Sequence, residues 1–497
     1  MGFDRSNFEM DRNQRQQLGY QLIDRINDYF SSLTHRPVQQ PAEQRSFALL
    51  QNDLPELGED AARVLDNICA ELIDQGFHVP SANYFGLMNP TPTYMAVLAE
   101  ALVAALNPQL ATLARSQLAS KIEHETVGWI AQRVGWPHGE NQSENVGGTF
   151  TSGGNEANFS ALALALTHHF PQIVDDGLIG LGARPVFYAS RESHHSLDKS
   201  LGLLGLGRKA LCRVPVTPNA AMDVPALEAQ ILADKAAGLF PLAVIGTAGT
   251  TSSGAIDPLP ALADLCARHT LWFHVDGAYG GAAIFSDKHR HLVAGIERAD
   301  SITIDPHKWL AMPFSAGVLL TRHPALLETV FGIDTAYLPK SSHGPLPDYF
   351  RISAQWSRRM NSLKFWLTLR VHGRVAYEEM IDRQLQLAGY LEEQVLATGS
   401  FDVATPRALT ILNFRARLAN ELHLDEPTTA RLHREIVSTL TEDGEHWIST
   451  SRVNGESVLR MMIISYLTRT EHVDALVEKL RTSAQQAAEA MGLLKPR

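Results

Sequence analysis

Residues 301–309 read SITIDPHKW, a short apolar run followed at once by charged and aromatic residues. The run 301–304 predicts a buried strand, and Lys308 comes just after its end. Most lysines extend along the protein surface with a solvated amine, and that interpretation applies to Lys308 as well. A partly desolvated lysine, by contrast, has a lowered pKa and forms Schiff bases readily, which makes Lys308 a candidate nucleophile.

Similar apolar runs recur along the chain around this segment. They lie at Val186–Ala189, Leu211–Val214, Leu242–Ile245, Leu271–Val275 and Val318–Leu320. Runs that are apolar throughout suit strands buried on both faces of a parallel sheet. Helical segments between them, such as Leu259–His269, favour right-handed βαβ crossovers. We therefore predict a large α/β domain over residues 91–372, with a mostly parallel central sheet.

The flanking parts of the chain have other patterns. Two early stretches carry apolar residues at helical spacing: 10–35 and 59–77. They predict an N-terminal helical segment over residues 1–90, which is too small to bury both of its faces alone. Near the other end, helical patterns surround two strand candidates, at 409–414 and 458–465. This predicts a small C-terminal α+β domain over residues 373–497.

Composition excludes several classes of function. The net charge of the 497-residue chain is −11, which argues against nucleic-acid binding. No apolar stretch is long enough to span a bilayer, so we expect no membrane partner. The three cysteines are scattered, which favours a reducing compartment and predicts neither a disulfide framework nor a metal site. We expect a cytoplasmic protein.

Polar residues that follow the predicted strands are the candidates for chemistry, because ligands bind beyond the carboxyl ends of parallel strands. Asp276 follows the run 271–275, and it could equally be a turn or helix-capping aspartate. Residues 147–158, GGTFTSGGNEAN, lead into an apolar helix and predict a site for a single phosphate at the helix start. His194 follows the run 186–189, although a lone histidine is more often structural.

Five segments together resemble the group II pyridoxal 5′-phosphate (PLP)-dependent decarboxylases, which act on aromatic amino acids, glutamate, histidine or diaminobutyrate. The segments are TSGGNEAN at 151–158, ESHHS at 192–196, GTAGTTSSGAID at 246–257, HVDGAYGG at 274–281 and DPHKW at 305–309. They occur in the family's order. The resemblance, which extends from about residue 80 to 470, implies the PLP fold type I (aspartate aminotransferase-like), PLP as cofactor, and decarboxylation of a small-molecule L-amino acid to its amine and CO₂.

The resemblance also implies roles for individual residues. Lys308 would hold PLP, Asp276 would pair with its ring nitrogen, and His194 would stack on the ring. The phosphate would bind at Gly154 and Asn155. Further cofactor contacts would come from Thr251, Ala278 and His307. Tyr337 matches the tyrosine that returns a proton to Cα, where aldehyde-forming relatives tend to have phenylalanine.

Substrate, reaction and assembly are less closely specified. The expected substrate wall is less aromatic and more polar than in aromatic decarboxylases: Leu87, Met88, Asn89, Gln109 and Ala111. Asp305, where aromatic members often have asparagine, points the same way. An aromatic substrate and a polar one (2,4-diaminobutyrate or glutamate) both stay open, as do transamination, aldehyde synthesis and a silent PLP-binding scaffold. The family implies a homodimer with active sites at the interface, and the polar stretch 340–347 predicts a loop.

Overall fold

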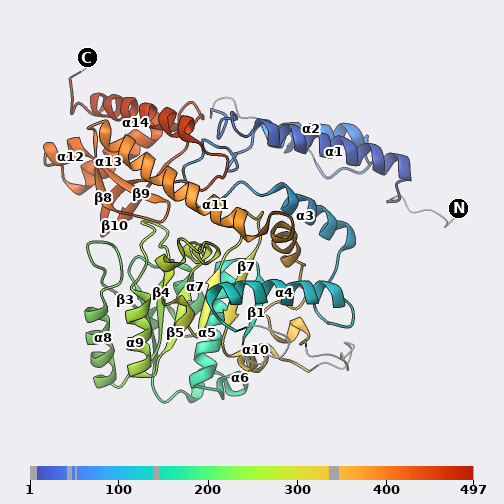
Figure 1. Cartoon of the computed structure of the whole chain (residues 1–497), viewed down its shortest axis with the longest axis vertical. Coiled ribbons are helices and arrows are strands. Elements are labelled where there is room, and N and C mark those ends of the chain that lie inside the picture. The colour runs from blue at the N-terminus through green and yellow to red at the C-terminus, as the bar shows by residue number, and fades with distance from the viewer. Residues whose placement is uncertain (1–7, 42–47, 51–52, 138–145, 335–345, 496–497) are drawn as a thin grey trace.

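The computed structural model describes the chain except for residues 1–7, 42–47, 51–52, 138–145, 335–345 and 496–497. A central sheet with helices on both sides forms the largest part of the molecule (Figure 1). A smaller C-terminal sheet with its own helices lies beside it, and two N-terminal helices extend away from the rest (Figure 1). Within the described ranges, no helix combines the length and apolar character needed to cross a membrane.

The central sheet has seven strands. Their spatial order is β1 (Gly147–Thr151), β7 (Gly317–Thr321), β6 (Ser301–Ile304), β5 (Trp272–Asp276), β4 (Phe240–Thr247), β2 (Pro185–Ser190) and β3 (Leu211–Val214). The strands from β6 to β3 are parallel, whereas β7 is antiparallel to both of its neighbours. The predicted mostly parallel sheet is confirmed. Because β7 is antiparallel to both β1 and β6, strands β1 and β6 run in the same direction.

The strands are buried on both faces, as their apolar runs predict. On β2, Val186 and Tyr188 pack into one core, and Phe187 and Ala189 pack into another. The first core includes residues of α4 (Gln117–Val134), α8 (Val224–Ala236) and α9 (Leu259–His269). The second includes residues of α5 (Gly154–His169), α7 (Ser196–Leu203) and α10 (Pro324–Phe331). Two helical layers therefore enclose the sheet and leave its ends as the places for a site.

The C-terminal part contains an antiparallel sheet in the order β10 (Ser449–Val453), β11 (Glu456–Met462), β9 (Ile411–Ala416) and β8 (Phe401–Ala408). Its helices are α11 (Ser362–Ala397), α12 (Arg417–Glu421), α13 (Glu426–Thr441) and α14 (Thr470–Ala490). Helix α11 is interrupted at Gly373, whose φ of 74° no helix accommodates. The predicted domain boundary falls at this interruption, and the domain bounds themselves stay a prediction.

The N-terminal helices are α1 (Arg12–Ser32), α2 (Ala61–Asp74) and α3 (Tyr94–Leu106). Helices α1 and α2 pack on each other, and α3 packs on α11. Neither α1 nor α2 contains a buried residue, although α2 in particular is amphipathic. This agrees with the sequence, which predicts a helical segment too small to bury both of its faces alone.

Candidate active site

A hollow of about 400 Å³, partly open to solvent, lies where the carboxyl ends of β4, β5 and β6 meet the start of α5. Seven of the eight residues expected to hold or contact the cofactor line this central hollow: Gly154, Asn155, His194, Thr251, Asp276, Ala278 and Lys308. The position at strand ends is typical of small-molecule sites in open α/β sheets.

Asp276 is the last residue of β5 and is buried. Its Oδ2 accepts a hydrogen bond of 2.9 Å from the side-chain amide of Asn158, and its Oδ1 accepts one of 3.2 Å from the backbone N–H of Ala278. Burial of a carboxylate is tolerable when donors surround it. Donors from two different elements therefore hold this carboxylate, which has lone pairs for a further donor.

Lys308 follows β6 and keeps about a quarter of its side chain exposed, towards the central hollow. Its Nζ lies 3.0 Å from Oδ2 of Asp305, a carboxylate that is almost fully buried. The backbone N–H of Asp305 is bonded to the carbonyl of Ala278, which connects this turn to the turn after β5. Lys308 is thus a partly buried amine with a charged partner, and the surface-lysine interpretation is wrong.

His194 lines the hollow from the segment that leads into α7. Its Nδ1 accepts a hydrogen bond of 3.1 Å from the backbone N–H of Ser196, so the ring proton is on Nε2. Burial lowers the pKa of His194, and the neighbouring Asp276 offsets part of this effect. The ring is therefore neutral, with one N–H to offer. Its neighbour His195 is exposed.

The glycine-rich segment divides into two structures that the sequence did not separate. Residues 147–151 form strand β1, and helix α5 begins at Gly154. A Cβ atom on Gly154 would lie 2.7 Å from Oδ2 of Asp305, so only glycine fits there. A helix start presents unbonded backbone N–H groups and the positive end of the helix dipole, and both suit a phosphate.

His307 lies against this loop, since a Cβ atom on Gly153 would be 3.0 Å from its ring. Its Nδ1 accepts a 2.9 Å hydrogen bond from the backbone N–H of Ala316, which leaves the proton on Nε2. Burial lowers the pKa of His307 to about 4. The ring is a neutral N–H donor beside the start of α5.

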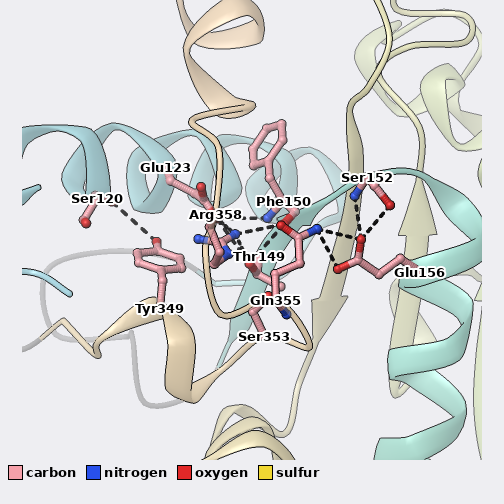
Figure 2. A network of polar contacts seen from close by, with 10 residues as sticks. All are labelled: Ser120, Glu123, Thr149, Phe150, Ser152, Glu156, Tyr349, Ser353, Gln355 and Arg358. Atoms are coloured by element: carbon pink, nitrogen blue, oxygen red, sulfur yellow. Dashed lines mark hydrogen bonds and ion pairs between the residues drawn. The ribbon is translucent and has the colours of Figure 1, made fainter. Parts of the chain in front are cut away.

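A network of polar contacts supports the same loop from behind (Figure 2). Glu156, in the first turn of α5, accepts hydrogen bonds from the backbone N–H and the hydroxyl of Ser152, at 2.8 and 2.6 Å. The amide of Gln355 donates to the same carboxylate, at 2.9 and 2.7 Å. Figure 2 shows Gln355 bridging from the segment before α11 to the loop. The loop is therefore tied to two parts of the chain.

Four functional candidates escaped the sequence analysis. Thr247, at the end of β4, lines the hollow with a buried hydroxyl that has no partner among the described residues. Asn158 lies one helical turn after Gly154 within the quoted TSGGNEAN, and that spacing could have placed it on the same face. Ser196 lies in the quoted ESHHS. Arg460, from β11, is buried and donates to the carbonyl of Thr251 at 2.8 Å, and no local motif marks it.

The structure does not place every residue expected near the substrate at the hollow. Of the five residues expected at the substrate wall, only Met88 lines it within the described part of the chain. Tyr337 lies outside the described residues, as does most of the predicted loop 340–347.

The comparisons with known proteins agree with this geometry. The model of the pyridoxal-dependent decarboxylase conserved domain matches residues 41–417. The chain belongs to the pyridoxal-dependent decarboxylase family. The aromatic-L-amino-acid decarboxylase of Bacillus atrophaeus is 30% identical to it over 97% of this chain and 98% of that protein. The acidic amino acid decarboxylase of Bos taurus is 33% identical over 70% of this chain and 66% of that protein.

A solved structure extends the likeness to the fold. Oryza sativa TDC, crystallised with PLP and tryptamine, superimposes with a TM-score of 0.89 at 26% identity, covering 97% of this chain and 99% of that one. The predicted PLP fold type I and the PLP cofactor are confirmed. The protein is a PLP-dependent amino-acid decarboxylase.

The residues present fit this cofactor. The central hollow is lined by the partly exposed amine of Lys308 and by two buried carboxylates. Asp305 pairs with Lys308, and Asp276 has lone pairs for a further donor. The start of α5 at Gly154 presents backbone N–H groups that suit an anion, and the Thr247 hydroxyl has no partner among the described residues. An amine, an acid for a ring nitrogen and an anion site are the three features that PLP needs.

Proposed function

We propose that Lys308 holds PLP through its amine while Asp276 pairs with the ring nitrogen. When bound, PLP supplies an electron sink for the electron pair released as the bond from Cα to the carboxylate breaks. Asp276 would keep the ring nitrogen protonated, because an adjacent carboxylate raises the pKa of a cationic nitrogen. The observation that carries this proposal is that both side chains line one hollow with the start of α5.

The remaining roles follow from the chemistry of each group. Gly154 and Asn155 would bind the phosphate through backbone N–H groups at the start of α5. His307 would add a neutral N–H donor there, and the neutral ring of His194 would lie against the cofactor ring. Thr251 and Ala278 line the same hollow and would contact the cofactor directly.

Asp305 would interact with Lys308 rather than with the cofactor. Its Oδ2 lies 3.0 Å from Nζ of Lys308 in the interior of the protein. Whenever the amine of Lys308 is free, Asp305 would be its charged partner. That partner stabilises the free lysine without help from solvent.

We further propose that the substrate is an L-amino acid with an uncharged side chain, an aromatic one first. Lys308 is the only lysine or arginine among the described residues that line the hollow. Its amine is committed to the cofactor, so a second carboxylate, as in glutamate, would meet no cation of this chain there. Met88 adds an apolar, polarisable surface that suits an aromatic ring. The Bacillus atrophaeus relative, similar over the whole length, supports the same choice.

A screen of L-amino acids for CO₂ release, with PLP added, tests this proposal. Tryptophan, tyrosine, phenylalanine, glutamate and 2,4-diaminobutyrate should be compared by kcat/KM. We expect an aromatic amino acid to lead. A preference for glutamate or diaminobutyrate would refute the substrate class and leave the roles of Lys308 and Asp276 standing. Lys308→Ala should release no CO₂ and lose the visible absorbance of lysine-bound PLP, and an active variant would refute the central role.

We also propose a cytoplasmic homodimer. Helices α1 and α2 bury no residue, and Leu72 on α2 is 66% exposed, so a second copy of the chain is the expected cover. Leu72→Glu should then convert a dimer to a monomer in sedimentation analysis. Leu232→Glu is the matched control, because Leu232 is similarly exposed on α8, far from α1 and α2 (Figure 1). A monomeric parent protein would contradict the proposal. The three cysteines are free thiols, which favours a reducing compartment.

A further inference from the structure

A chain of buried side chains leads from Asp276 into the interior of the central sheet. The Nδ2 of Asn158 lies 2.9 Å from Oδ2 of Asp276, and its Oδ1 lies 3.1 Å from Nε2 of His274. Asn158 is 1% exposed and His274 is fully buried. His274 precedes Asp276 by two residues on β5, so Asn158 on α5 connects two side chains of one strand.

The far end of the chain lies at Ser301 on the neighbouring strand β6. Nδ1 of His274 is 2.9 Å from the hydroxyl of Ser301 and 3.1 Å from the carbonyl oxygen of Ser301, and the hydroxyl accepts a 2.9 Å hydrogen bond from the indole N–H of Trp272. The hydroxyl hydrogen of Ser301 is then available for Nδ1 of His274. The Asp276 carboxylate takes an N–H of Asn158, so the Asn158 oxygen faces Nε2 of His274, and that nitrogen carries a proton to donate. Burial lowers the pKa of His274 to about 4, in agreement with a neutral ring.

This proton fixes the orientation of the Asn158 amide. An asparagine side chain can rotate so that its oxygen and nitrogen exchange places. The N–H of His274 requires the oxygen on its side, and the nitrogen then faces Asp276 and the hydroxyl of Ser196. Without His274, the amide oxygen could turn towards the Asp276 carboxylate and repel it. Two acceptors would then oppose each other in a site with little solvent.

We propose that His274 is a positioning residue of the decarboxylase, which acts through Asn158 to keep the Asp276 carboxylate ionised and aimed at the ring nitrogen of PLP. The proposal rests on the proposed pairing of Asp276 with that nitrogen. His274 itself touches neither cofactor nor substrate in this arrangement. Its effect is therefore expected on the protonation of the cofactor ring rather than on substrate binding.

The test uses holoenzyme reconstituted with PLP labelled with ¹⁵N in the ring, observed by NMR. His274→Phe keeps a buried ring and removes its N–H. Tyr188→Phe is the matched control, since it removes one buried hydrogen bond, to Asp234, from a ring in the same sheet. We expect the parent and Tyr188→Phe to show a protonated ring nitrogen and His274→Phe to lose that signal. PLP affinity and kcat should fall about tenfold to a hundredfold in His274→Phe, with KM little changed.

Two more variants separate the possible outcomes. His274→Gln can still donate to Asn158 and should restore part of the ¹⁵N signal. An unchanged signal and affinity in His274→Phe would overturn the proposal. If His274→Phe does not fold, Asn158→Asp replaces the donor to Asp276 by an acceptor, and an unchanged ¹⁵N signal there overturns it equally. Asp276→Asn tests the underlying pairing: if it leaves the ¹⁵N signal unchanged, the proposed role of Asp276 itself fails.

Discussion

Arg358 and Glu123 form an ion pair in the interior of the protein, with 2.7 Å between Nη2 and Oε1 and at most 1% of either side chain exposed. Both groups also bond to the last part of β1: the backbone N–H of Phe150 donates to Glu123, and Arg358 donates to the carbonyl of Phe150 (Figure 2). The pair thus joins α4 and the segment before α11 to the strand that leads into the phosphate loop. Each buried charge is tolerated because the other is present.

Removal of one member of this pair should therefore destabilise the protein more than removal of both. We expect Arg358→Met to lower the free energy of unfolding by about 3–5 kcal/mol, because Glu123 is left buried and unpaired. The double variant with Glu123→Leu should recover part of this loss. Urea denaturation measures both. Arg359→Met is the control, since Arg359 pairs with Glu100 near the surface and should cost less than about 1 kcal/mol. Equal losses in Arg358→Met and Arg359→Met would contradict the expectation.

The hydrogen bonds from Gln355 to Glu156 should strengthen the binding of PLP through the PLP phosphate group. Gln355→Leu removes the donor that holds the Glu156 carboxylate, which in turn holds the backbone of Ser152. We expect PLP to bind the apoprotein roughly tenfold more weakly, as one charge-assisted hydrogen bond is lost. Binding of pyridoxal, which has no phosphate, should not change. Fluorescence titration of the apoprotein measures both affinities.

Gln386→Leu provides the matched control for this experiment. Gln386 also donates to a carboxylate, that of Asp382 at 3.0 Å, but on the exposed side of α11. Its replacement should leave both affinities unchanged. If Gln355→Leu weakened pyridoxal and PLP to the same degree, the bridge would not act through the phosphate loop.

The sequence predicted best the strands that are mostly buried. Strand β6, which is buried throughout, has the predicted bounds, and so does β3, although Cys212 and Arg213 in it are half-buried. Strands β8 and β10 escaped notice, since one face of each is exposed and their sequences alternate. Strand β1 was not predicted, because it begins with two glycines and lies within the predicted phosphate-binding segment. A search for apolar runs thus finds buried strands better than strands with one exposed face.

Some residues of the site could likewise be predicted from the sequence, and others could not. Lys308 and Asp276 were predictable because they follow apolar strands, where ligands bind. Arg460 was not, because strand β11 of the C-terminal sheet brings it to the carbonyl of Thr251, and this contact depends on how that sheet packs against the rest of the chain. Asn158 could have been predicted from its helical spacing to Gly154. Its hydrogen bond to His274, on which its proposed role depends, is seen only in the structure.

Buried histidines should make the protein less stable in mild acid. Burial lowers the pKa of His433 to about 4, whereas the unfolded chain has the ordinary value near 6.5. Between these values the unfolded chain binds a proton that the folded chain does not, so stability is lost as the pH falls through this window. One such group contributes a slope of up to about 1.4 kcal/mol per pH unit. His433→Gln should reduce the slope, measured by urea denaturation between pH 7 and 5.

His372→Gln is the control for the acid experiment. His372 is exposed on α11, so its surroundings are similar in the folded and unfolded chain. Its replacement should leave the pH slope as it is. An equal effect of the two substitutions would show that His433 is not responsible.

Tyr337 should decide what becomes of the product after CO₂ leaves. Its role rests on the resemblance to the family, where this tyrosine returns a proton to Cα and phenylalanine accompanies aldehyde formation. Tyr337→Phe keeps the ring and removes the acidic O–H, so protonation of Cα should slow while loss of CO₂ continues. We expect the ratio of amine to CO₂ to fall well below one, with aldehyde, ammonia and hydrogen peroxide formed at the expense of O₂. Product analysis with an oxygen electrode measures this. A variant that still gives amine and CO₂ in equal amounts, at the parent's rate, would show that another group delivers the proton.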